Sequence, residues 1–131
     1  SHKLKIPGEL HLGTWKIKTK LIDLPNNSNP DSLKYLHESA YSETFDISIL
    51  ETDLHVRTRK SGDKFVPLGM NQVKRLKDFM IDSKIPSHHR DRIPLVCSNA
   101  EIIWVVGCRI SNWAKIKKPN TKAIQINFES I

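Results

Sequence analysis

Basic side chains are concentrated between Arg57 and Arg92, where ten lysines and arginines stand against four acidic residues. A guanidinium group presents a planar fork of N–H donors, which suits bidentate binding to phosphate oxygens. Arg57 and Arg59 alternate in a predicted strand and would project from the same face. Three further basic residues would lie on the outer arc of the helix predicted next: Lys74, Arg75 and Lys77. Together they could follow one phosphate backbone, although each alone is more often a solvated charge.

The positive charge is unevenly distributed along the chain. The 131 residues carry a formal net charge of +7, with a pI near 9.5. Residues 1–54 sum to −2, whereas residues 55–131 sum to +9 and contain all six arginines. A local surplus of this kind is typical of a protein with a phosphate-bearing partner. A merely solubilising surface would also explain +7, and the clustering shifts the balance toward nucleic acid.

No catalytic or metal-binding motif accompanies these basic residues. The sequence holds neither GxGxxG nor GxxxxGK[ST], and the Gly62 region lacks the second Gly and final Ser of a pyrophosphatase loop, so it predicts a turn. Cys97 and Cys108 are 11 residues apart without a CxxC pattern, and we interpret them as small buried thiols in strands. For the adjacent His88 and His89, a structural role and contact with RNA both remain open. We therefore expect no catalytic residue, cofactor or metal in this chain.

The composition excludes several classes of protein. Apolar residues make up 38% of the chain and charged residues 27%, which permits a packed core. The longest apolar run, residues 102–106, is far shorter than the ~20 residues of a membrane-spanning helix. The cysteines are too few for a disulfide framework, so a reducing, cytoplasmic setting is expected.

The hydrophobic pattern predicts an α+β fold with mostly antiparallel sheets in a layered sandwich and one main helix. Strands are expected where apolar and polar residues alternate, and in one apolar hairpin, over the segments 15–22, 45–49, 54–58, 95–97, 102–106 and 124–128. The main helix is expected over Asn71–Asp82, with an apolar stripe formed by Val73, Leu76, Phe79 and Met80.

The remaining predictions concern connections and tryptophans. Turn-forming residues predict a loop over residues 25–30, and a short helix is expected over residues 31–41. A helical turn is expected after Pro86. Trp15 and Trp113 are assigned to the core, which leaves few aromatic residues for stacking on single-stranded RNA.

A long ordered pattern carries a resemblance to a known family. It reads R-x-R-x-x-G-D-x-F-x-P-x-G from Arg57 to Gly69, then K-x-L-K-D, then K-I-P and R-D-x-x-P-L, and ends at Arg109. This pattern resembles the C-terminal domain of bacterial tRNA(Ile)-lysidine synthase, over about residues 54–128. Residues 3–53 resemble the less distinctive segment that precedes it, so we expect a β-rich part over 3–53 and a family core over 54–131, within one compact domain.

The resemblance implies a part in tRNA modification. Such enzymes use ATP to adenylate the wobble cytidine of the isoleucine tRNA with a CAU anticodon, and lysine then displaces AMP. In such enzymes the adenylating loop belongs to an N-terminal pyrophosphatase domain, and we expect no such loop within these 131 residues. ATP and lysine are therefore expected for the parent enzyme, a ligase, and no chemistry is expected in this chain alone.

The resemblance also implies a partner and a set of contact residues. In the family this domain helps to bind the tRNA body toward the acceptor stem, and it resembles a domain of the phenylalanyl-tRNA synthetase β subunit. The basic positions expected to contact RNA are Arg57, Arg59, Lys64, Lys74, Arg75, Lys77, Arg90 and Arg109. The alternative is a structural module that packs on the catalytic domain or forms a homodimer without binding RNA.

Overall fold

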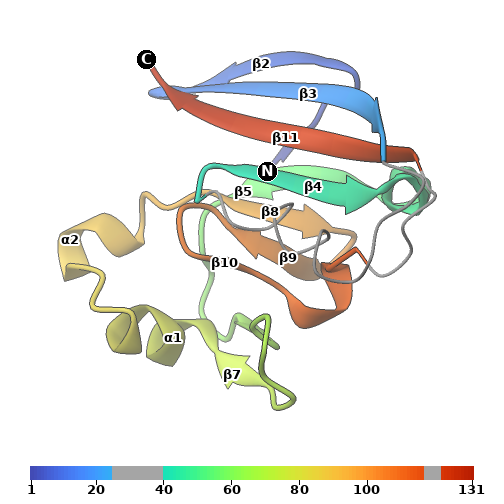
Figure 1. Ribbon diagram of the computed structural model, residues 1–131. Helices are drawn as coiled ribbons and strands as arrows, with labels where there is room; N and C mark the ends of the chain where they lie inside the picture. The colour runs from blue at the N-terminus through green and yellow to red at the C-terminus, as the bar shows by residue number, and fades with distance from the viewer. Residues whose placement is uncertain (25–39, 117–121) are drawn as a thin grey trace. The chain divides into compact units, whose positions relative to one another are not determined.

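The computed structural model describes residues 1–24, 40–116 and 122–131 (Figure 1). The chain divides into two compact units. The first unit contains Ser1–Lys3 and Thr52–Ala114, and the second contains Leu4–Glu51 and Lys115–Ile131. The C-terminal strand therefore belongs with the N-terminal segment rather than with residues 54–114. The loop predicted over residues 25–30, and residues 31–39 of the predicted short helix, lie outside the described residues.

The first unit is built on a five-stranded antiparallel sheet of order β1-β5-β8-β9-β10 (Figure 1). Its strands are β1 (His2–Lys3), β5 (Leu54–Arg57), β8 (Leu95–Ser98), β9 (Glu101–Val105) and β10 (Arg109–Ile110). The predicted hairpin of β8 and β9 is confirmed, with β9 inside the sheet because it is apolar on both faces. Its turn uses Asn99 at a φ of 53°, a conformation that asparagine tolerates well.

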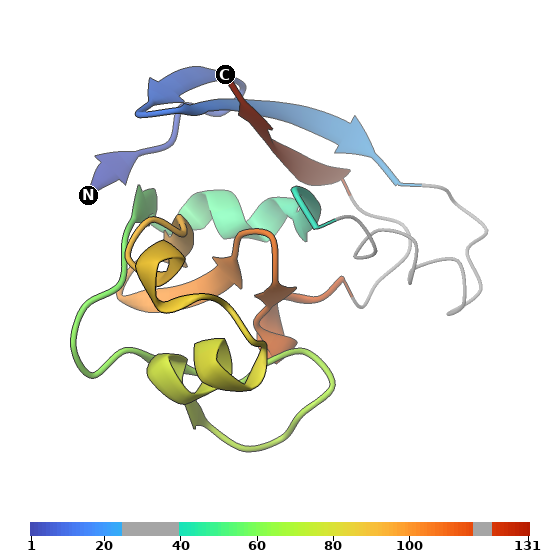
Figure 2. The ribbon, with the colours of Figure 1, turned by 90° about the vertical axis from the view of Figure 1, so that its left-hand side faces the viewer.

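Two short helices follow each other in the first unit and lie next to each other in the foreground of Figure 2. They are α1 (Leu76–Asp82) and α2 (Ser87–Arg90). The predicted main helix exists but begins five residues later than expected, because Lys74–Arg75 forms β7 and pairs with β6 (Lys64–Phe65). Val73 consequently lies outside the helix and is 63% exposed. The pairing with a distant strand overrides the local helical period.

The second unit contains a four-stranded antiparallel sheet of order β2-β3-β11-β4. Its strands are β2 (Gly8–Leu12), β3 (Trp15–Asp23), β4 (Ser42–Asp46) and β11 (Lys122–Ser130). The strand predicted over 45–49 ends at Asp46, and the 3-10 helix η2 (Ile47–Glu51) follows. The Asp46 carboxylate accepts a hydrogen bond from the Ser48 backbone N–H at 2.9 Å, and such a local bond ends a strand.

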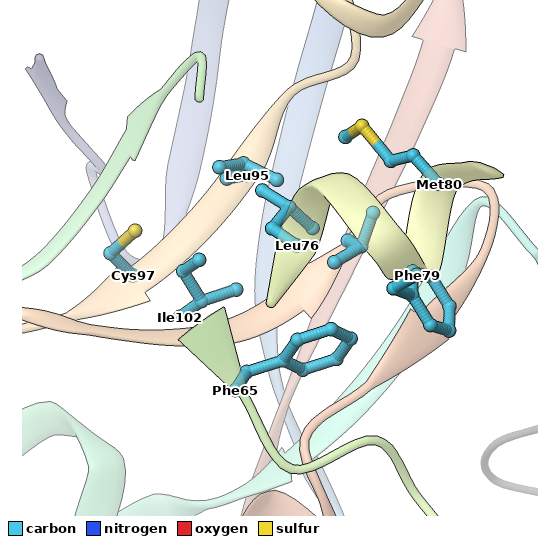
Figure 3. Close-up of a cluster of buried hydrophobic side chains, with 8 residues drawn as sticks. Phe65, Leu76, Phe79, Met80, Leu95, Cys97 and Ile102 are labelled. Carbon is cyan, nitrogen blue, oxygen red and sulfur yellow. The ribbon is translucent and has the colours of Figure 1, made fainter. Parts of the chain in front are cut away.

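A hydrophobic cluster fastens α1 to the sheet of the first unit (Figure 3). Leu76 and Phe79 come from the helix, and Figure 3 shows Leu76 next to Leu95 and Ile102 of the hairpin. The Phe79 ring meets the ring of Phe65 edge to face, with centroids 5.0 Å apart. Because interiors of this kind are closely packed, the cluster holds β6 and α1 at one position on the sheet.

The expected fold class is confirmed in its main feature, since the described residues form mostly antiparallel sheets with few helices. No described helix has the length and apolar character needed to cross a membrane. Cys97 is buried in β8 as predicted, whereas Cys108 is half-buried in the turn after β9.

Candidate nucleic-acid interface

An internal ion pair sets the shape of the loop that joins β5 to β6. The Arg57 guanidinium donates two hydrogen bonds to the Asp63 carboxylate, at 2.9 and 3.0 Å. The side chains of Arg57 and Asp63 are only 10% and 13% exposed. Arg57 was expected to contact RNA, but its donors are directed at Asp63 and at the Thr58 carbonyl oxygen.

The loop closes around the same carboxylate. Asp63 also accepts a hydrogen bond from the Lys60 backbone N–H at 2.7 Å, which closes the predicted turn. Gly62 has a φ of 86°, a conformation that favours glycine. The Asp63 carbonyl oxygen accepts a hydrogen bond from the Leu76 N–H at 2.8 Å, so the loop is joined to the start of α1.

Arg57 and Asp63 each stabilise the charged form of the other. Burial opposes ionisation of Asp63, but the hydrogen bonds from Arg57 and the Lys60 backbone, with the charge of Arg57, outweigh it, so the pKa of Asp63 lies below its ordinary value. The hydrogen bond to Asp63 likewise raises the pKa of Arg57. Burial raises the pKa of the Cys97 and Cys108 thiols, so neither is a ready nucleophile at neutral pH.

A cleft of about 620 Å³ lies beside this loop. Three stretches of the first unit line it: the loop 59–63, the junction of β7 and α1 at 75–77, and the end of α2 at 90–91. The cations on its walls are Arg59, Lys60, Arg75, Lys77 and Arg90. Four of the eight basic residues expected to contact RNA therefore share one cleft, although up to 31 positions separate them in the sequence.

The two carboxylates of the cleft are already engaged. Arg57 forms an ion pair with Asp63, and Arg59 donates from Nε to Asp91 at 2.8 Å. Within the part of the chain that the structure describes, no carboxylate pairs with Lys60, Lys77 or Arg90. The cleft therefore holds unneutralised positive charge, which attracts phosphate groups.

The other predicted contact residues lie outside the cleft. Lys64 is exposed on β6, and Lys74 forms an ion pair with Asp82. Arg109 is exposed, with its guanidinium carbon 5.5 Å from the centre of the Phe79 ring. None of these three cations lines the cleft.

No metal site accompanies these cations in residues 1–24, 40–116 and 122–131, where no group of three potential ligands among His, Cys, Asp and Glu comes together. The rings of His88 and His89 lie 4.1 Å apart between centroids at the exposed surface of α2. The cleft itself offers hydrogen-bond donors and positive charge, and its chemistry is that of anion binding.

Comparison with known proteins identifies the family of this chain. Residues 54–128 match the family described as the TilS substrate C-terminal domain. The chain belongs to this family. The match covers more than half of the chain and includes every residue that lines the cleft.

Curated relatives of this chain include two tRNA(Ile)-lysidine synthases. A tRNA(Ile)-lysidine synthase from Dehalococcoides mccartyi is 39% identical over 127 residues, covering 97% of this chain and 26% of the relative. A tRNA(Ile)-lysidine synthase from Caldanaerobacter subterraneus is 40% identical over 126 residues, covering 95% and 26%. The chain thus spans about a quarter of the length of these curated relatives.

A solved structure supports the family assignment. A crystal structure of a TilS C-terminal domain aligns with a TM-score of 0.78 and 26% identity, covering 99% of this chain and 95% of that one. The family is therefore as the resemblance implied, and the mostly antiparallel fold matches that of a TilS C-terminal domain.

Two residues of this TilS C-terminal domain escaped prediction from the sequence. Lys60 lines the cleft but occupies a variable position of the R-x-R-x-x-G-D pattern, and its place beside Gly62 in a tight turn was the available signal. Trp113 was assigned to the core and is instead 44% exposed. The available signal was its polar surroundings, Ser111, Asn112 and Lys115, which contrast with the apolar run 102–106 around the buried Trp104.

Proposed function

We propose that this chain is the C-terminal domain of a tRNA(Ile)-lysidine synthase and that the basic cleft binds the backbone of the tRNA. The observation that carries the proposal is the set of cations Lys60, Lys77 and Arg90 without carboxylate partners in the described residues, around a loop shaped by an internal ion pair. Duplex RNA is recognised largely through shape, phosphates and 2′-hydroxyls, which suits such a cleft. The names of the relatives point to the same substrate.

In this proposal the residues have different roles. Lys60, Lys77 and Arg90 bind phosphates directly, and Arg75, whose side chain is 75% exposed beside Asp78, reaches the same backbone. Arg57 and Asp63 position the loop. Lys64, Lys74 and Arg109 extend the positive field around the cleft and steer the RNA toward it.

The chemistry of the parent enzyme belongs outside this chain. Adenylation of the wobble cytidine by ATP and attack by lysine are assigned to the N-terminal catalytic domain, in the cytoplasm. The domain described here grips the tRNA body toward the acceptor stem while that reaction proceeds. A fold relation to a domain of the phenylalanyl-tRNA synthetase β subunit is part of the same proposal.

Fluorescence anisotropy tests this function. The chain is titrated with the CAU isoleucine tRNA, an elongator methionine tRNA and a generic RNA duplex, each at about 50 and 200 mM salt. The double variant Lys60→Ala/Lys77→Ala should bind all three about 10- to 100-fold more weakly, as two charge-assisted contacts are lost. Its dependence on salt should become shallower by about two counterions.

The variant Lys18→Ala/Lys20→Ala is the matched control, because it removes two positive charges from exposed positions of β3 in the second unit. It should bind nearly as well as the unaltered chain. Equal losses of affinity in the two double variants would show that binding depends on the overall positive charge of the chain and not on the cleft. Absence of binding at the lower salt concentration would favour the structural module that packs on the catalytic domain or forms a dimer.

A further inference from the structure

A second hollow of about 480 Å³ lies beside the basic cleft in the first unit. The two hollows share Gly62 and Asp63 on their walls. The second hollow, here called the tryptophan groove, is apolar over much of its lining, where Phe65, Val73 and Trp113 take part. It has no role in the function proposed above.

The tryptophan groove exposes large apolar side chains on a firm support. Val73 is 63% exposed and Trp113 is 44% exposed. Trp113 lies in the 3-10 helix η3 (Asn112–Ala114), whose first residue donates a backbone hydrogen bond to the Val66 carbonyl oxygen at 2.7 Å. An indole ring on a supported turn loses little conformational entropy when a flat ligand covers it.

Polar groups complete the lining. Lys64 and Glu101 are both exposed and line the groove, which provides one cation and one hydrogen-bond acceptor. Ser111 also lines it, and its buried hydroxyl has no hydrogen-bond partner among the described residues. An aromatic ring face with a few donors and acceptors is the usual composition of a site for a nucleobase.

The cleft and the tryptophan groove are joined by a cross-strand pair. Lys64 of β6 lies directly opposite Arg75 of β7 in the antiparallel ladder. Side chains at opposite positions project from the same face, about 5 Å apart at Cβ. Arg75, which pairs with Asp78, lines the cleft and Lys64 lines the groove, so one basic side chain of this pair belongs to each hollow.

We propose that the tryptophan groove receives an unpaired nucleobase of the RNA held in the basic cleft, stacked on Trp113, with the neighbouring phosphate on Lys64. The inference rests on the function proposed above, because the cleft supplies the rest of the RNA. The two adjacent basic side chains favour RNA over an apolar protein segment, which would gain nothing from Lys64 and Arg75. The domain then distinguishes a duplex with a single-stranded extension from a blunt one.

The test compares two RNA hairpins that share the same stem. One ends blunt, and the other carries a four-nucleotide 3′ extension that contains 2-aminopurine. The full chain should bind the extended hairpin about tenfold more tightly, since stacking of one base on an aromatic ring has this magnitude. The fluorescence of 2-aminopurine should fall on binding as the base stacks.

Variants separate the groove from the cleft. Trp113→Ala should abolish the preference for the extended hairpin and the fluorescence change, while its affinity for the blunt hairpin stays unchanged. Trp113→Phe should retain part of the preference for the extended hairpin and part of the fluorescence change. Tyr41→Ala, which removes another exposed aromatic side chain in the second unit, should alter neither.

The outcomes distinguish the two proposals. If binding of the blunt hairpin depends on Lys60 and Lys77 but the chain does not prefer the extended hairpin, the nucleobase site is overturned and the cleft proposal stands. A preference that survives Trp113→Ala would also overturn it. The same absence of a preference is expected if the tryptophan groove binds a protein segment instead of a nucleobase. Failure of the blunt hairpin to bind at all would overturn the cleft.

Discussion

The two units carry basic residues in different ways. The first unit has 12 lysines and arginines against six acidic residues, and the second has nine against eight. On β3 of the second unit, Lys16 lies 3.6 Å from Glu9 and Lys18 lies 3.7 Å from Glu129. In the cleft of the first unit, the carboxylates bind Arg57 and Arg59, and Lys60, Lys77 and Arg90 have no carboxylate partner among the described residues. The arrangement of the acidic residues, more than the number of basic ones, therefore distinguishes a phosphate-binding surface from a solvated one.

The largest effect is expected where the cleft depends on its internal pair. Asp63→Ala leaves the Arg57 charge nearly buried without a partner and opens the loop that Asp63 closes. We expect a loss of about 3 kcal/mol in the free energy of unfolding, measured with urea, together with weaker RNA binding. Asp91→Ala breaks an ion pair whose carboxylate is 79% exposed, and it should cost at most about 1 kcal/mol. Equal costs for the two variants would contradict the distinction between a positioning pair and a surface pair.

A smaller effect is expected from pH on the same carboxylate. The pKa of Asp63 is lower in the folded chain than its ordinary value, so its pairing stabilises the fold above about pH 4 and this stabilisation is lost as the pH falls through the folded pKa. The unfolding free energy of the unaltered chain should therefore approach that of Asp63→Asn as the pH is lowered from about 5 to 3. The measurement is a pair of urea titrations at each pH. A constant difference between the two proteins would contradict a lowered pKa for Asp63.

The smallest effect is expected in the second unit. Glu9→Gln/Glu129→Gln removes the carboxylates that pair with the half-buried Lys16 and the exposed Lys18. Affinity for a generic duplex at about 50 mM salt should rise by no more than about threefold, because these lysines line neither the cleft nor the tryptophan groove. The increase should disappear at about 200 mM salt. Anisotropy against the unaltered chain measures it. An increase comparable to the loss in Lys60→Ala/Lys77→Ala would show that pairing alone separates the two surfaces.

Local patterns in the sequence were sufficient to predict several elements of the fold. The alternation over residues 15–22 correctly predicted β3, where Ile17 and Thr19 are buried and Lys18 and Lys20 are exposed. The apolar run at 102–106 correctly predicted an interior strand. The predicted beginning of α1 was wrong, because β7 pairs with β6 through a residue 11 positions away, and this pairing leaves no local signal in the sequence.

The sequence by itself determined the family, the charge surplus and the alternation of buried and exposed positions, because these depend on residue types and on periods of two or 3.6 residues. Only the tertiary structure decided which charges remain available. Arg57 pairs with a residue six positions away and Arg59 with one 32 positions away. Trp113 was likewise left exposed by the arrangement of distant segments. Ion pairing and exposure depend on distances between side chains in space, and residues far apart in the chain acquire those distances only when the chain folds.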